Sequence, residues 1–175
     1  MQNVLVVVDM QNDFIDGALG TKEAVAIVPN VKAKIENFEG TVLFTRDTHY
    51  EDYMETQEGK NLPVVHCVKG TDGWEIIPEL KVLCEEKNCK CYDKPTFGST
   101  ALAADLKNMY EAGELESVEL VGICTDICVV SNALMIKAFM PELPVALDSA
   151  CCAGVTPEKH EAALETMRSC QILVK

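Results

Sequence analysis

Three side chains with complementary chemistry follow predicted β-strands in this sequence: Asp9, Lys94 and Cys128. A cysteine thiolate attacks carbonyl carbons, a carboxylate can take the thiol proton and return it to a leaving amine, and a lysine stabilises negative charge. Cys128 is expected where the chain leaves the turn 122–126 and starts a helix, a position whose free amide N–H groups and dipole lower a thiol pKa. The trio indicates nucleophilic catalysis. A buried inert thiol is the alternative for any one cysteine.

A second group of residues has the chemistry of a metal site. Asp47 and His49 are two residues apart, and His66 follows across a loop. Glu58 in that loop is our choice for a fourth ligand, with Glu55 as a rival. Carboxylate and imidazole ligands together suit zinc, iron or manganese, so we expect one divalent ion, with zinc preferred.

The elements that must position these residues alternate along the chain. Short apolar, β-rich runs predict six strands, and helical patterns predict four helices between them. The strands are expected at 3–8, 41–45, 88–92, 118–121, 144–147 and 171–174, and the helices at 24–38, 99–111, 127–139 and 157–169. The last helix has Thr156 as its expected cap and Pro157 at its first position. This alternation predicts an α/β fold: a single-domain three-layer α/β/α sandwich over residues 1–175, with a six-stranded, mostly parallel sheet.

Ligands of open α/β sheets bind beyond the carboxyl ends of the strands, and this rule gathers the polar residues at one edge. Asp9, Asp47 with His49, Lys94 and the stretch 124–128 each follow a different predicted strand. The fifth strand is expected to end at Asp148 and Ser149, which would lie at the rim. The segment 46–74 fits neither a helical nor a strand period, apart from a short turn near Trp74. Such an insert in a compact domain is usually functional.

Composition narrows the class of partner. A formal charge of −13 opposes binding to nucleic acid and to anionic membranes, and no apolar run is long enough for a signal peptide or a membrane span. We therefore expect a cytoplasmic protein with a small-molecule partner, and a homo-oligomer is compatible with the sequence. Nine cysteines, an odd number, indicate reduced thiols. Those outside 124–128 are expected to pack in the core, Cys84, Cys89 and Cys91 among them.

Five blocks of sequence occur in the order found in a known family. They are Val7 to Phe14, Thr45 to His49, Pro63 to Thr71, Asp93 to Pro95 and Gly122 to Cys128. Together they resemble the isochorismatase-like cysteine hydrolases, and within them the nicotinamidases, over nearly the whole chain. The resemblance implies a catalytic triad of Asp9, Lys94 and Cys128, and a metal held by Asp47, His49 and His66.

The same resemblance implies an oxyanion hole and a substrate. A non-proline cis peptide maps to Ile123-Cys124, and the backbone amides of Cys124 and Cys128 would face the oxyanion. Phe14 and Ile123 are the expected substrate contacts, whereas Leu62 stands where such enzymes usually have a tryptophan. The expected reaction is hydrolysis of nicotinamide or pyrazinamide to the acid and ammonia through a thioester.

Two alternatives stay open at this stage. One is a related cysteine hydrolase acting on another small amide or carbamoyl compound. The other is a thiol redox or binding protein that uses Cys124 and Cys128 reversibly.

Overall fold

The sheet has six parallel strands in the order β3-β2-β1-β4-β5-β6, in a computed structural model that describes all 175 residues. The strands are β1 (Gln2–Val8), β2 (Thr41–Asp47), β3 (Lys90–Lys94), β4 (Leu115–Ile123), β5 (Val145–Ala153) and β6 (Leu173–Val174). All six expected strands are present, and the sheet is parallel throughout. The order reverses direction at β1, so the carboxyl ends of β1 and β4 flank the switch point where such sheets bind ligands.

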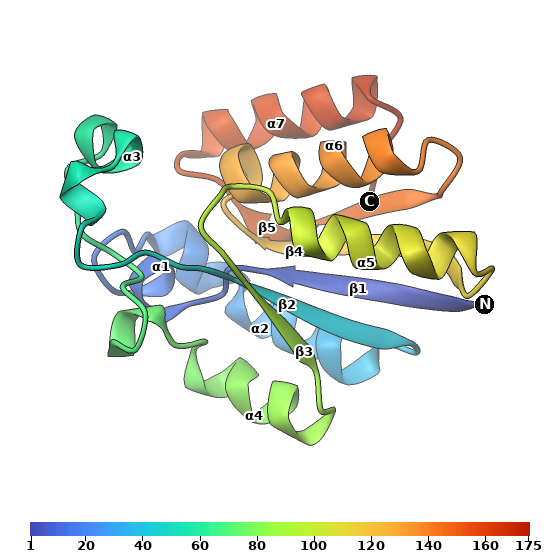
Figure 1. Cartoon of the computed structure of the whole chain (residues 1–175), viewed down its shortest axis with the longest axis horizontal. Coiled ribbons are helices and arrows are strands. Elements are labelled where there is room, and N and C mark those ends of the chain that lie inside the picture. The colour runs from blue at the N-terminus through green and yellow to red at the C-terminus, as the bar shows by residue number, and fades with distance from the viewer.

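Helices cover both faces of this sheet, as expected for an α/β sandwich. Figure 1 shows α5 (Thr100–Glu111), α6 (Val130–Phe139) and α7 (Pro157–Ser169) on one face, with α2 (Lys22–Asn37) and α4 (Pro78–Glu86) on the other. Side-chain caps fix the starts of several helices: Thr21, Ser99 and the expected Thr156 each accept a hydrogen bond from a first-turn amide. The sequence did not predict α4, nor the short α1 (Asn12–Ile15).

Two apolar clusters hold the layers together. One joins β1, β4 and β5 to α5, α6 and α7, and the other joins the opposite face to α2 and α4. The five residues Val4 to Val8 are all fully buried and alternate between the two clusters. This is why the first strand is apolar throughout, as central parallel strands are.

The insert between β2 and β3 is more ordered than expected. It contains the 3₁₀ turns η1 (Tyr53–Glu55) and η2 (Asp72–Trp74) and the short helix α3 (Gln57–Asn61). In Figure 1, α3 stands away from the layered body at the carboxyl end of the sheet. Thr56 caps α3 by accepting from Gly59 N, but five residues are too few to give a helical period, so the sequence signal was missing.

The expected end of the fifth strand was wrong. β5 continues past Asp148 and Ser149 to Ala153, because extra residues between Leu147 and Cys152 bulge out of register before pairing resumes at Gly122. The Asp148 carboxylate lies 2.6 Å from Lys34 Nζ on α2 and is not part of the rim. None of the helices combines the length and the apolar character that spanning a membrane requires.

Candidate active site and metal centre

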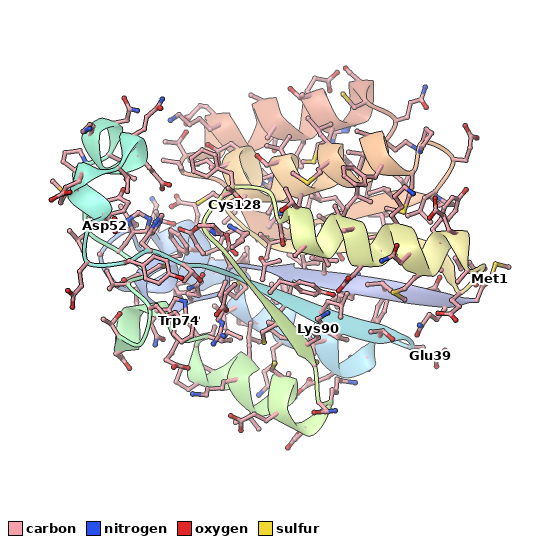
Figure 2. All side chains as sticks on the ribbon, in the orientation of Figure 1. Met1, Glu39, Asp52, Trp74, Lys90 and Cys128 are labelled. Carbon is pink, nitrogen blue, oxygen red and sulfur yellow. The ribbon has the colours of Figure 1, made fainter.

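Asp9, Lys94 and Cys128 meet below the surface at the carboxyl edge of the sheet. Asp9 directly follows β1, Lys94 is the last residue of β3, and Cys128 lies in the turn after β4. Lys94 Nζ is 2.7 Å from Asp9 Oδ2 and 3.4 Å from Cys128 Sγ. All three residues are buried, the thiol included. In Figure 2, Cys128 lies toward the end of the molecule that carries Asp52, far from Met1.

The main chain makes room for this meeting at two positions. Asp9 has a φ of +50°, a conformation that Asp tolerates better than most residues and that often marks functional sites. Gly122 has a φ of +114°, and a Cβ there would lie 2.2 Å from Val8 O. Only glycine therefore lets β4 approach β1 closely enough to place Cys128 beside Asp9.

Burial dominates the electrostatics of the trio. Burial raises the pKa of the Cys128 thiol well above its usual value, and the negative charge of Asp9 raises it further, against the opposing charge of Lys94. Burial also raises the pKa of Asp9, despite the neighbouring Lys94. Burial alone would lower the pKa of Lys94, but Asp9 and the other anions outweigh it and hold that pKa above its usual value. The expected lowering of the thiol pKa is therefore wrong: the resting cysteine is protonated and needs a base.

The nucleophile lies within a single π-helical turn. The turn η3 (Thr125–Val129) leads into α6, and Val129 N donates to Cys124 O at 3.1 Å. The peptide bond between Ile123 and Cys124 is cis, as the resemblance implied. The helix thus begins at Thr125, slightly earlier than expected, and the proposed oxyanion donors at Cys124 and Cys128 lie at its start.

The four proposed metal ligands, called the metal group below, also come together. One ligand atom from each of Asp47, His49, Glu58 and His66 lies within 4.8 Å of the others. Asp47 Oδ2 is 2.9 Å from His49 Nε2 and 3.5 Å from His66 Nε2. Glu58 Oε1 is 3.6 and 3.8 Å from the same two nitrogens. Glu55 is exposed and is not part of this group.

This donor set fits a divalent ion such as zinc. Ligands held at about 2.1 Å in a tetrahedron lie about 3.4 Å apart, close to the spacings here. His66 Nδ1 is 2.7 Å from Val64 O, and this hydrogen bond leaves Nε2 free to bind a metal. Burial would raise the pKa of Asp47, but contacts with both histidines and with Lys94 hold it well below its usual range, so a negative ligand is available.

Lys94 links the two groups, because its Nζ also lies 3.6 Å from Asp47 Oδ1. Two buried side chains that the sequence did not single out, Gln11 and Thr45, hold the arrangement. Gln11 accepts from Asp47 N at 2.7 Å and donates to Asp47 O and Trp74 O at 2.9 and 2.8 Å. Thr45 Oγ1 donates to Asp9 Oδ1 at 2.6 Å. Gln11 lies in the Val7 to Phe14 block and Thr45 opens the next one, and this was the signal that could have found them.

The ring contacts follow the expectations in part. The Phe14 ring is half-buried with its centroid 5.5 Å from that of His66, beside the metal group. The Ile123 side chain instead packs in the core on the α2 face, so only its backbone remains at the site. Tyr53 was not foreseen: its buried ring meets the edges of His49 and His66, and its hydroxyl donates to Leu62 O at 2.8 Å.

Trp74 packs in the core, with Nε1 donating to Thr48 Oγ1 at 2.9 Å and the Arg46 guanidinium 3.8 Å above its ring.

A pocket of about 320 Å³ opens beside the metal group, lined by residues of the insert and by Pro95. This volume is in the range of small-molecule sites.

Comparison with known proteins agrees with this fold. A pyrazinamidase of Pyrococcus horikoshii, solved in complex with zinc, superposes with a TM-score of 0.81 at 29% identity, over 100% of this chain and 99% of that one. An N-carbamoylsarcosine amidase of Thermoplasma acidophilum superposes with a TM-score of 0.79 at 28% identity, over 100% and 96%. The nicotinamidase/pyrazinamidase of Mycobacterium tuberculosis is 27% identical over 180 residues, which cover 96% of this chain and 95% of that protein. The family model for the isochorismatase domain matches residues 3–174, and the chain therefore belongs to the isochorismatase family.

Proposed function

We propose that this protein is a metal-containing cysteine amidohydrolase that converts nicotinamide to nicotinate and ammonia. The observation that carries the proposal is the adjacency of the two groups: a buried Asp9, Lys94 and Cys128 trio, and a four-ligand metal group joined to it by Lys94. The nicotinamidase and pyrazinamidase names of its relatives support the same reaction.

The first half of the reaction forms a thioester. Asp9 takes the proton of the Cys128 thiol, and the resulting thiolate attacks the carboxamide carbon. The amide N–H groups of Cys124 and Cys128 stabilise the oxyanion. Asp9 then gives its proton to the amide nitrogen, the carbon–nitrogen bond breaks, and ammonia leaves.

The second half releases the acid. Asp9, again ionised, takes a proton from a water molecule, whose oxygen attacks the thioester carbon. The carbon–sulfur bond breaks, the sulfur recovers the proton from Asp9, and the carboxylic acid leaves. Lys94 stays protonated throughout, because its pKa is raised, and stabilises whichever neighbour carries the negative charge.

The metal group gives a reason for a pyridine substrate. Asp47, His49, Glu58 and His66 would hold one divalent ion, with zinc preferred. When bound, such an ion would supply Lewis acidity toward a ring nitrogen, provided that its coordination expands beyond the four side chains. Phe14, next to His66, provides an apolar face for the ring.

The test is ammonia release from nicotinamide, with nicotinate measured in the same samples. We expect turnover in the wild type and in Cys170→Ser, whose thiol is exposed, and none in Cys128→Ala. Hydroxylamine should divert the thioester to the hydroxamic acid. Full activity of Cys128→Ala, or no hydroxamate at saturating hydroxylamine, would contradict the mechanism.

A second candidate is an amidase for carbamoyl compounds, supported by the similarity to N-carbamoylsarcosine amidase. A substrate panel separates the two. Nicotinamide and pyrazinamide should be cleaved far better than benzamide, which lacks a ring nitrogen, and than N-carbamoyl amino acids. A preference for carbamoyl substrates that survives His66→Ala would favour the second candidate.

A thiol redox role for Cys124 and Cys128 is the weaker alternative. Burial raises the pKa of Cys124 to about 12, which disfavours the thiolate that disulfide chemistry requires. A redox role for these thiols would also require neither Lys94 nor the metal group.

A further inference from the structure

Three cysteines gather away from the catalytic site, where α4 turns into the edge strand β3. Cys84 lies in the last turns of α4, Cys89 follows the helix, and Cys91 is the second residue of β3. Cys84 is buried, whereas Cys89 and Cys91 are half-buried. Lys90, which lies between the last two, is well separated from Cys128 in Figure 2. Neither the proposed amide hydrolysis nor the metal group uses these thiols.

Two of the three sulfurs are already in contact. Cys91 points to the sheet face that α4 covers, and its Sγ lies 3.6 Å from Cys84 Sγ. A disulfide bond is about 2.05 Å long, so the two sulfurs need to approach by about 1.6 Å to form one. The residues are seven positions apart, and no other element lies between them in the chain. Plain packing explains why such thiols are buried, but not why two of them face one another.

Their surroundings make the two thiols unequal. The sulfur contact with Cys84 and, next, the positive charge of Arg46 on β2 lower the pKa of Cys91 to about 7, against burial and Asp93. The same contact with Cys91, together with burial, raises the pKa of Cys84. One attacking thiolate beside one protonated thiol is the arrangement of a reactive and a resolving cysteine.

We propose that Cys84 and Cys91 form a peroxide-sensitive thiol pair that closes reversibly to a disulfide joining α4 to β3. The Cys91 thiolate attacks a hydroperoxide, breaking the O–O bond and forming a sulfenic acid, and an alkoxide or hydroxide leaves. The Cys84 thiol then attacks the sulfenic sulfur, and the oxygen leaves as water with the thiol proton. The cysteine pair loses two electrons in total and the hydroperoxide gains them. A dithiol reductant reverses the change by exchange.

The size of the effect follows from the thiolate fraction. At pH 7 a thiol with a pKa of about 7 is half ionised, about sixteen times more than one with a pKa near 8.5. A thiolate of lower pKa is also a weaker nucleophile, which reduces its reaction rate about fivefold. Cys91 should therefore react with peroxide about three times faster than an ordinary thiol.

Trypsin places the three thiols on separate peptides, which makes the pair directly observable. Cys84 falls on 82–87, Cys89 on 88–90 and Cys91 on 91–107, since cleavage does not occur before Pro95. The full-length protein is treated with hydrogen peroxide at pH 7, blocked with an alkylating reagent and analysed by mass spectrometry. We expect 82–87 linked to 91–107, with free Cys91 lost about three times faster than exposed Cys170, and full recovery after dithiothreitol.

Variants identify the order of events. In Cys84→Ala the crosslink should vanish, and a dimedone adduct should appear on Cys91. Cys170→Ser is the matched control and should form the crosslink at the wild-type rate. Absence of the crosslink between 82–87 and 91–107, a crosslink to the Cys89 peptide, or direct passage of wild-type Cys91 to sulfinic acid would each overturn the pairing. None of these readouts measures amide hydrolysis, so failure here is distinct from failure of the proposed reaction.

Discussion

Replacing Asp9 with asparagine tests whether this carboxylate is the base or a structural partner of Lys94. The change keeps the shape, and Thr45 can still donate to the remaining oxygen. It removes the 2.7 Å partner of a lysine that is 1% exposed, and breaking a buried ion pair costs about 3–5 kcal/mol. Because Asp47 Oδ1 still lies 3.6 Å from Lys94 Nζ, we expect the free energy of unfolding to fall by about 3 kcal/mol, the lower end of that range. A domain with about 5–15 kcal/mol of stability survives that loss.

The two functional readouts should move in opposite directions. Loss of a general base lowers kcat by about 10²- to 10⁴-fold. The same change removes a negative charge that raises the pKa of Cys128, while Lys94 Nζ stays 3.4 Å from the sulfur. Each unit by which that pKa falls should speed alkylation at neutral pH about three- to four-fold, after allowing for the lower nucleophilicity of the thiolate.

The assay pairs steady-state ammonia release with iodoacetamide labelling of Cys128 in substrate-free protein. Labelling is located by fragmentation of the tryptic peptide 108–137, which also contains Cys124. Cys170 serves as an internal standard for the reagent. Slower turnover with faster labelling is the expected result. If labelling slows together with turnover in a variant that remains folded, Asp9 promotes formation of the thiolate in the resting enzyme, and the account in which its charge raises the pKa of Cys128 is refuted.

Three further predictions concern pH, metal and stability. Because burial raises the pKa of Asp9 and the reaction needs its ionised form, kcat/KM should fall with acid through a pKa above the ordinary value of about 3.9, as a pH–rate profile would reveal; an acid limb below pH 4 would contradict this. Glu58→Gln should lower metal affinity about 10- to 100-fold or more, measured as metal content after dialysis against a chelator, while the exposed Glu55→Gln should leave it unchanged; equal effects would remove Glu58 from the site. Gln11→Ala leaves the buried N–H and C=O groups of Asp47 without their partner and should cost about 3 kcal/mol or more in urea unfolding; a loss under 1 kcal/mol would show that water replaces the side chain.

The sequence predicted the sheet well and assigned the candidate residues to its carboxyl edge, because both follow from patterns that the chain itself carries. Apolar runs ending in polar residues marked the strands and their carboxyl ends together. Asp9, Lys94 and Cys128, which are far apart in the chain, could therefore be assigned to one edge of the sheet. The choice of Glu58 over Glu55 agrees with the cluster that the structure shows.

What the sequence missed depends on tertiary contacts. The bulge that carries β5 past Asp148 depends on pairing with β4, and no alternation within β5 reveals it. Tyr53 lies in an insert without a regular period, and only the folded insert brings its ring against His49 and His66. The wrong sign for the Cys128 pKa has the same origin. Proximity to a helix start is a local property, whereas full burial is a property of the whole fold.

That raised thiol pKa is nevertheless compatible with a nucleophile. Burial raises the pKa of both Cys128 and Asp9, and the ease of a proton transfer between them depends on the difference between the two values. Because the two shifts have the same sign, they partly cancel in that difference. The transfer turns a carboxylate and a thiol into a carboxylic acid and a thiolate, so it moves one negative charge within a dry site and creates none. Lys94 Nζ is in contact with both ends of that movement, at 2.7 and 3.4 Å, and need not shift as the charge passes from oxygen to sulfur. A thiol that is inert toward solvent and reactive toward a bound amide follows from this arrangement, since the base that activates it is buried with it.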